Sequence, residues 1–324
     1  MAVSKAKKRK MKKKVAKAIF GKSLTLVMLL LVLFGLIGIC AYEYSEPFRQ
    51  WVDELGIFST QAPAIPPIDP EGDEMAVHFI DVGQGDATLF QTSKGSVLVD
   101  CGEKEYGDDV VAYLKAQGVS ELEYFIITHP DSDHMGCASY VLENITVKTF
   151  VMNGQEKTTQ FFEKALDVIE EKQIAVDIVG PGDVLTVGAL QMKIYGPQPN
   201  LVNSTEWNEA SLIIHATYGN RSFLLTGDAE EKGEEDLLAN YNGELLKCDV
   251  FSAGHHGSKT SNSPELLEAA RPTYVVISCG EGNSYGHPHQ EALDVFADVG
   301  AIVYRTDELG SIVFITDGET LTKR

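Results

Sequence analysis

The stretch ITHPDSDHMGC, residues 127–137, decides the fold because it places four potential metal ligands within six positions. Its two imidazoles and two carboxylates belong to His129, Asp131, Asp133 and His134. The apolar run YFIIT just before it predicts a buried strand, and a helix is expected to begin at Asp133. Donor atoms that converge from a short strand–loop–helix segment suit a metal ion better than a solvated acidic turn does. The stretch therefore predicts a metal site at a sheet edge.

Further donors follow other predicted strands. An aspartate ends FLLTGD, two histidines lie in GHHGS, and two more lie in YGHPH. Together with the stretch 127–137, these turns hold six of the eight histidines. Two neighbouring ions require such clustering. The donors singled out in these turns are Asp228, His255, His256 and His287.

From Met75 onward, apolar runs of strand length alternate with helical patterns. Hairpins mix with β–α units, and the scheme occurs twice along the chain. This pattern predicts an α/β domain in which two sheets pack face to face with helices outside. Helices are expected over 108–116, 133–142, 230–238, 264–269 and 290–299.

The N-terminal region predicts a membrane anchor. Residues 1–22 hold ten Lys and Arg and no acid, and residues 23–42 are uncharged and long enough to span a bilayer as a helix. The positive-inside rule places the basic tail in the cytoplasm and the rest outside the cell. Residues 43–74 contain five prolines and predict an extracellular linker to the folded domain, 75–324. A cleaved signal peptide, a lipoprotein and a nucleic-acid-binding tail are the alternatives.

Charge and cysteine usage exclude some classes of function. The chain outside the basic tail contains 17 Lys and Arg and all 47 Asp and Glu, which gives it a net charge of about −30. Such a body repels polyanions, which counts against non-specific nucleic-acid binding by the globular part. The five cysteines form no CxxC pair and are expected to be small buried residues.

The ordered motifs HFIDVGQGDATLF, VLVDCG, THPDSDHMGC, TGD, GHHGS and YGHPH resemble the metallo-β-lactamase superfamily over residues 75–316. Within it, the chain resembles the soluble hydrolase domain of ComEC-type competence proteins. The resemblance implies an αββα four-layer sandwich with two divalent metal ions, zinc or manganese, in a cleft between the sheets. Because only one span is predicted here, the chain is expected to be a stand-alone, membrane-tethered relative.

The resemblance also implies two ligand sets joined by Asp228. Asp131 stands where the superfamily signature HxHxDH has its second histidine. The histidine ligand that family members have before the bridging aspartate is also missing. His255 is expected to take its place as a ligand, and His256 is expected to lie nearer the substrate. The choice between these two histidines stays open. The implied sets are His129, Asp131 and His255 for one ion, and Asp133, His134 and His287 for the other. Asn208 and Ser211 occupy the positions before the bridge.

Two ions held close together generate hydroxide at neutral pH and stabilise the oxyanion that forms on attack. In this scheme Asp133 can accept a proton, and Asp100 orients a ligand histidine. Ser258 and Lys259 suit an anionic substrate oxygen, although a turn that caps the next helix explains them equally well. The catalytic residues expected from this reasoning are Asp133, His256 and Lys259.

The glycine-rich stretch DVGQGDA, residues 81–87, lacks the GxGxxG spacing of a dinucleotide-binding loop, so no nucleotide cofactor is expected. A tight hairpin near the site is predicted instead, with Asp81 and Asp86 holding the turn or supporting the ligands.

The function favoured by these observations is an extracellular, membrane-tethered phosphodiesterase, with DNA as the first candidate substrate. A phosphocholine-type esterase, a β-lactamase or lactonase, and a non-catalytic module of DNA uptake or of the envelope are the alternatives. A carboxylate at Asp131 favours harder ions, so Mn²⁺ is expected to support activity at least as well as Zn²⁺. The oligomeric state is not indicated.

Overall fold

The computed structural model describes residues 66–68, 70, 72–202 and 206–324. The predicted tail, the predicted membrane span and most of the predicted linker lie outside these residues. Within the described part of the chain, no helix combines the length and the apolar character needed to cross a membrane.

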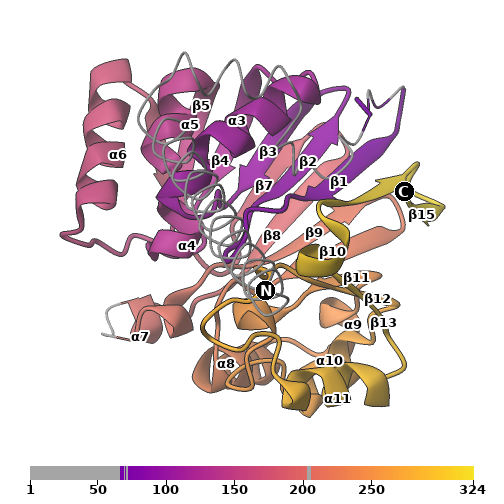
Figure 1. Cartoon of the computed structure of the whole chain (residues 1–324). Coiled ribbons are helices and arrows are strands. Elements are labelled where there is room, and N and C mark those ends of the chain that lie inside the picture. The colour runs from indigo at the N-terminus through magenta and orange to yellow at the C-terminus, as the bar shows by residue number, and fades with distance from the viewer. Residues whose placement is uncertain (1–65, 69, 71, 203–205) are drawn as a thin grey trace, which may run out of the picture. The chain divides into compact units, whose positions relative to one another are not determined.

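Two mixed sheets form the core (Figure 1). The first has the strand order β15-β14-β1-β2-β3-β4-β5-β6, and the second has the order β13-β12-β11-β10-β9-β8-β7. The first comprises β1 Met75–Phe79, β2 Thr88–Thr92, β3 Gly95–Val99, β4 Glu121–Ile126, β5 Thr146–Met152, β6 Ala175–Ile178, β14 Ile312–Thr316 and β15 Leu321–Lys323. The second comprises β7 Val184–Val187, β8 Leu190–Gly196, β9 Ile213–Tyr218, β10 Arg221–Leu225, β11 Val250–Ser252, β12 Tyr274–Ile277 and β13 Ile302–Arg305.

Each sheet is antiparallel on one side and parallel on the other. The change falls at β3 in the first sheet, where β2 pairs antiparallel and β4 parallel. It falls at β10 in the second sheet, where β9 pairs antiparallel and β11 parallel. The two sheets therefore repeat one scheme, and the prediction of a two-sheet α/β fold is confirmed.

Three apolar clusters define the layers. One lies between the sheets, where the Phe90 ring of β2 meets the Phe223 ring of β10 edge to face at 5.9 Å. A second joins the outer face of the first sheet to helices α3, α5 and α6, and a third joins the second sheet to α8, α10 and α11 (Figure 1). Burial of apolar side chains at all three interfaces holds helix, sheet, sheet and helix together.

Four of the five expected helices are found as α3, α8, α10 and α11, one is divided, and α6 and the short helices α7, α9 and α12 were not predicted. The structure has α3 Gly107–Ala116, α4 Ser132–Met135, α5 Ala138–Asn144, α6 Gln160–Lys172, α7 Pro199–Val202, α8 Glu231–Asn240, α9 Gly243–Leu246, α10 Pro264–Ala270, α11 Gln290–Asp298 and α12 Thr306–Leu309. The single helix expected over 133–142 is two helices, α4 and α5. Helix α6 was not predicted, although Phe162, Ala165, Val168 and Ile169 form its buried stripe.

Strands β3, β4, β10, β11 and β12 all end in segments that carry predicted site residues. These are the parallel strands at and beyond the change of direction in each sheet. Carboxyl ends of parallel strands at such a switch are where layered α/β folds place ligand sites. The topology thus brings distant motifs to one edge of the sandwich.

A candidate dinuclear metal centre

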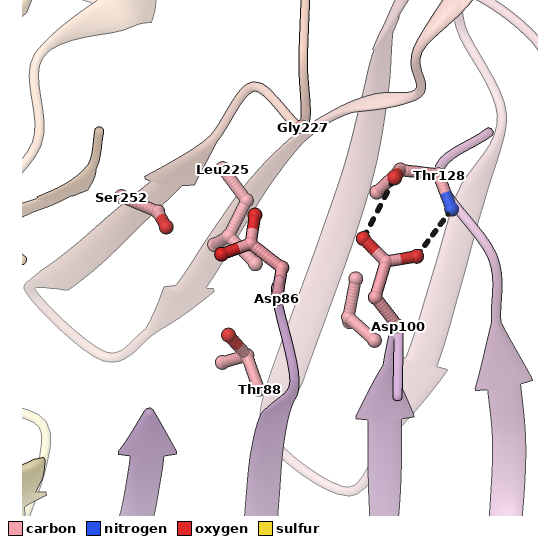
Figure 2. Close-up of a pocket in the computed structure, with 8 residues that line it drawn as sticks. Asp86, Thr88, Asp100, Thr128, Leu225, Gly227 and Ser252 are labelled. Atoms are coloured by element: carbon pink, nitrogen blue, oxygen red, sulfur yellow. Dashed lines mark hydrogen bonds between the residues drawn. The ribbon is translucent and has the colours of Figure 1, made fainter. Parts of the chain in front are cut away.

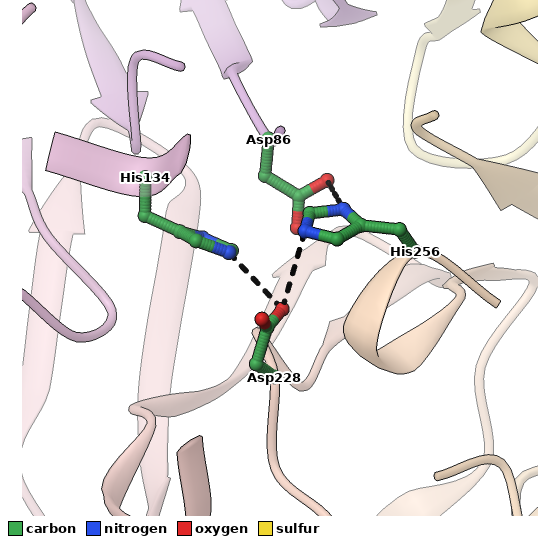
Figure 3. A group of neighbouring side chains, drawn as sticks. All are labelled: Asp86, His134, Asp228 and His256. Carbon is green, nitrogen blue, oxygen red and sulfur yellow. Dashed lines mark ion pairs between the residues drawn. The ribbon is translucent and has the colours of Figure 1, made fainter. Parts of the chain in front are cut away.

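Asp228 lies at the centre of the predicted site, just after β10, and its side chain is buried. Its Oδ2 is 3.8 Å from His129 Nε2 and 3.6 Å from His255 Nε2. Its Oδ1 is 3.0 Å from His134 Nε2 and 3.7 Å from His256 Nε2. Figure 3 shows the carboxylate between His134 and His256, with Asp86 beside them. Each carboxylate oxygen thus faces two imidazoles.

Two further carboxylates, those of Asp131 and Asp133, lie near the histidines on either side of Asp228. Asp131 Oδ1 is 4.0 Å from His129 Nε2, on the Oδ2 side. Asp133 Oδ2 is 3.2 Å from His256 Nε2, on the Oδ1 side. Donors therefore lie on both sides of the Asp228 carboxylate, and Asp86 adds a carboxylate to the group that holds His134 and His256.

These distances fit divalent metal ions. Two ligand atoms, each about 2.1 Å from a tetrahedral ion, are about 3.4 Å apart, close to the separations seen here. Ligand atoms of Asp86, His134, Asp228 and His256 all lie within 4.8 Å of one another. Buried polar atoms are normally hydrogen-bonded, yet several here have no such partner. They are Asp86 Oδ1, His129 Nε2 and His287 Nδ1, whereas His134 Nε2 and Asp228 Oδ1 form an ion pair with each other at 3.0 Å.

All four central imidazoles present Nε2 to Asp228, because a protein oxygen holds each Nδ1. Such contacts fix the tautomer and the ring orientation of metal-binding histidines. The Nδ1 partners are Thr128 Oγ1 for His129 (3.3 Å), Asp100 Oδ2 for His134 (2.9 Å), Glu230 Oε1 for His255 (3.1 Å) and the Ser278 carbonyl for His256 (3.0 Å). These contacts therefore orient the rings for ligation.

Asp100 is the most firmly held of these partners. Its carboxylate accepts bonds from the Thr128 backbone N at 2.8 Å and from Thr128 Oγ1 at 2.7 Å, in addition to His134. Asp100, Thr128 and Asp86 line a small pocket together with residues of both sheets (Figure 2). The predicted role of Asp100 in orienting a ligand histidine agrees with this geometry.

Charge and burial shift the pKa values inside the cluster. Burial acts to lower the pKa of His134, but the Asp228 and Asp100 carboxylates raise it well above its usual value. Burial acts to raise the pKa of Asp228, but the imidazoles of His134 and His256 hold it well below its usual range. Burial and the neighbouring His134 lower the pKa of His129 to about 4. Ion pairs therefore link the donors, and metal binding replaces protons that they hold.

The GHHGS turn has an unusual backbone. His255 (φ 49°) and His256 (φ 55°) both adopt left-handed conformations, which side chains other than glycine rarely do. The Asn262 side chain holds the turn by accepting from Gly254 N at 2.8 Å and donating to Gly254 O at 2.9 Å. Strain of this kind gathers at functional sites, where the surrounding structure enforces it. Here it turns two successive imidazoles toward Asp228.

The glycine-rich hairpin approaches the ligand stretch closely. Asp86 N donates to Asp133 O at 3.1 Å. Gly85 has φ +137°, and a Cβ there would lie 2.3 Å from Asp133 O, so only glycine fits. Asp86 lies in the ligand cluster itself, whereas Asp81 is exposed and accepts from Gly83 N at 3.1 Å. Of the two aspartates, Asp81 holds the turn and Asp86 faces the donor cluster.

The remaining predicted residues lie around the centre. Ser211 Oγ accepts from Asp228 N at 3.0 Å, and Asn208 bonds to Glu230. Ser258 Oγ is 2.9 Å from Thr260 Oγ1, and Lys259 is exposed. The Ser263 side chain, not that of Ser258, accepts at the start of α10.

His287 lies beside the HHGS turn. Its ring centroid is 5.4 Å from that of His255 and 6.2 Å from that of His256. His256, rather than His287, is the histidine in contact with Asp133.

Among the residues that sequence reasoning missed are two charged ones. Glu230, two positions after Asp228, pairs with His255 Nδ1. Lys157 pairs with Asp131 from the loop between β5 and α6. Glu230 stands next to the TGD motif and could have been found there, whereas no sequence pattern signals Lys157.

Comparison with known proteins agrees with this geometry. A profile described as the metallo-beta-lactamase superfamily matches residues 80–281, and the chain belongs to that superfamily, whose members are generally metal-dependent hydrolases. Within it, the chain is similar to ComE operon protein 3 of Bacillus subtilis (strain 168), with 33% identity over 267 residues, 77% of this chain and 34% of that protein. It is also similar to competence protein ComA of Neisseria gonorrhoeae, with 31% identity over 82% of this chain and 35% of that protein. The predicted resemblance is confirmed.

The chain spans about a third of the length of these two relatives. Among solved structures, the metallo-beta-lactamase fold protein YhfI from Bacillus subtilis matches 76% of this chain and 100% of its own, with a TM-score of 0.51 and 16% identity. That likeness supports the fold.

Proposed function

We propose that this protein is a metal-dependent phosphodiesterase with a dinuclear centre. One observation carries the proposal: the Asp228 carboxylate faces two imidazoles with each oxygen, and each pair is accompanied by a further carboxylate. This is the arrangement that a bridging ligand between two ions requires.

The distances support one assignment of ligands. One ion would take His129, Asp131 and His255, and the other would take Asp133, His134 and His256, with Asp228 shared. His256 thereby replaces His287 in the second set, and both histidines of the HHGS turn become ligands. His287 is left beside the centre, where its buried Nδ1 can meet the substrate.

When bound, two such ions supply an activated water and stabilise negative charge on the substrate. The chain's own residues prepare the site. Asp100 and Glu230 hold His134 and His255 in the ligating tautomer. Asp133, with one oxygen against His256, has a second oxygen that can accept a proton during attack.

DNA is the substrate class favoured here, because one of the relatives is named a competence protein. The net charge of −20 disfavours long contacts with duplex phosphates, so single-stranded or terminal phosphodiesters fit better. Asp131 in place of an imidazole shifts the preference toward harder ions, so Mn²⁺ is expected to support activity at least as well as Zn²⁺. In this proposal residues 23–42 tether the domain outside the cell.

A substrate panel tests the proposal. The full chain, purified in detergent and loaded with Mn²⁺ or Zn²⁺, would be assayed on bis-p-nitrophenyl phosphate, single- and double-stranded DNA, a phosphocholine ester and nitrocefin, with Asp228→Asn as the control. Turnover of the phosphodiesters that is lost in the control is expected. Turnover of nitrocefin alone would make the protein a β-lactamase, and metal binding without any turnover would indicate a non-catalytic module.

A further inference from the structure

Lys157 is a cation that the dinuclear site does not account for. It lies in the loop between β5 and α6, and its ammonium forms an ion pair with Asp131 Oδ1. The same ammonium lies over the Trp207 ring, 4.6 Å from the centroid. The Lys157 side chain is only 14% exposed, while that of Asp131 is 31% exposed. The ammonium is thus held beside a predicted metal ligand and near solvent.

The loop that carries Lys157 is fastened to the site. Asn153 donates to the carbonyl of Ala210 at 2.6 Å and to that of Thr128, at the start of the ligand stretch, at 3.3 Å. Gln155 accepts from the same Asn153 amide at 2.9 Å, and both side chains are buried. The contacts to Thr128 and Ala210 fix the loop against both the ligand stretch and the segment that bears Trp207.

This placement is unusual for the chain. Acids outnumber Lys and Arg by 47 to 27. Within the described residues, Lys157 is the sole lysine or arginine in an ion pair with a proposed ligand. Partial burial of an ammonium costs free energy, which Asp131 and the indole face offset. A divalent ion bound to Asp131 would neutralise the charge of that carboxylate by itself. A lysine that served only to neutralise Asp131 would then no longer be needed.

We propose that Lys157 binds a non-bridging oxygen of the substrate phosphodiester, next to the ion held by His129, Asp131 and His255. This inference rests on the proposed function. Asp131 Oδ1 pairs with Lys157 and is also the oxygen that lies 4.0 Å from His129 Nε2, so the ammonium stands directly beside the position proposed for this ion. Two positive charges then face the same side of the site, where an anionic phosphate satisfies both.

The arrangement also defines the substrate class. A phosphodiester carries one negative charge in its ground state, whereas a lactam, a lactone or a carboxylic ester carries none at its reacting group. Lys157 therefore selects anionic substrates, and Trp207 keeps its ammonium in place. The contribution of Lys157 is to binding, so it is expected in KM more than in kcat.

Four variants of the full chain test the proposal. Lys157→Met removes the charge, Lys157→Arg restores a cation, and Trp207→Leu removes the aromatic face. Lys148→Met is the matched control, because Lys148 pairs with Glu121 and Glu123 on the surface. The measurements are steady-state kinetics on bis-p-nitrophenyl phosphate, calorimetric titration of Mn²⁺, and calorimetric titration of inorganic phosphate into the Mn²⁺-loaded protein.

Loss of a hydrogen bond to a charged group predicts that Lys157→Met raises KM and weakens phosphate binding by about 10- to 100-fold. The Mn²⁺ affinity should stay within about threefold of that of the unaltered protein, Arg should recover most of the loss, and Trp207→Leu should fall between. Unchanged phosphate affinity with an altered Mn²⁺ affinity would overturn the proposal and reduce Lys157 to a partner of Asp131. If the unaltered chain hydrolyses no phosphodiester, the proposed function fails, while the phosphate titration still decides the role of Lys157.

Discussion

Replacing Asp100 by asparagine tests how the chain prepares a ligand histidine. The Asp100 carboxylate accepts three hydrogen bonds, from His134 Nδ1 and from the N and Oγ1 of Thr128. Asparagine has nearly the same shape but only one accepting oxygen. Its amide NH₂ must therefore face at least one of these donors.

The size of the effect follows from this mismatch. A buried donor left without an acceptor costs about 1–3 kcal/mol. With its oxygen in the Oδ1 position the asparagine keeps the Thr128 backbone N but turns its NH₂ toward His134 and the Thr128 hydroxyl, and with its oxygen in the Oδ2 position it keeps those two and leaves the Thr128 backbone N without an acceptor. In either orientation His134 loses the negative charge that makes it a stronger ligand. Changes to such supporting residues weaken metal binding by about 10- to 100-fold. We expect Asp100→Asn to weaken one metal site by this factor and to leave the other close to its original affinity.

The assay is a competition titration of the full chain with Mn²⁺ in the presence of a chromophoric chelator, which resolves two affinities. The weakened site should be the one that contains Asp133, His134 and His256. Asp109→Asn makes the same chemical change on the exposed side of α3 and should alter neither site. If both affinities of Asp100→Asn match those of the unaltered chain, Asp100 does not orient His134 for metal binding.

Three further predictions concern other parts of the chain. Gly85→Ala places a Cβ against Asp133 O at a positive φ. The change should lower the free energy of unfolding by at least about 2 kcal/mol in urea denaturation and should weaken Mn²⁺ binding. The control is Gly118→Ala, at φ +77° with open space around it, which should leave the Mn²⁺ affinity unchanged. Burial lowers the pKa of His78 to about 4, so between pH 7 and pH 5 the unfolded chain takes up a proton that the folded chain does not. Over this range the free energy of unfolding of the unaltered chain should fall by about 2 kcal/mol more than that of His78→Asn. Equal pH dependence of the two proteins in urea titrations would show that His78 is not the cause. After EDTA treatment, Mn²⁺ should restore phosphodiester turnover at least as well as Zn²⁺, and restoration by Zn²⁺ alone would contradict the role given to Asp131.

The sequence predicted the parts of this molecule that local pattern controls. Apolar runs located most strands of both sheets, although β5, β6, β7 and β15 were not predicted. Donors placed directly after the predicted strands identified Asp228 and the stretch from His129 to His134. These residues could be found because a strand end fixes where the next few side chains emerge.

Other features depend on contacts between distant segments. The left-handed backbone of His255 and His256 is enforced by Asn262, and it decides that both imidazoles turn toward Asp228. Lys157 reaches Asp131 only because its loop is fastened to the ligand stretch by Asn153. Neither contact leaves a repeating pattern in the sequence, so the pairing of His256 with Asp133 had to come from the structure.

The central claim is that Asp228 bridges two divalent ions. Metal analysis of the full chain after Mn²⁺ loading and desalting, combined with electron paramagnetic resonance of the same sample, tests it directly. We expect two Mn²⁺ per chain with an exchange-coupled spectrum, and fewer, uncoupled ions in Asp228→Asn. One ion per chain, or two uncoupled ions whose binding does not change in Asp228→Asn, would contradict the claim.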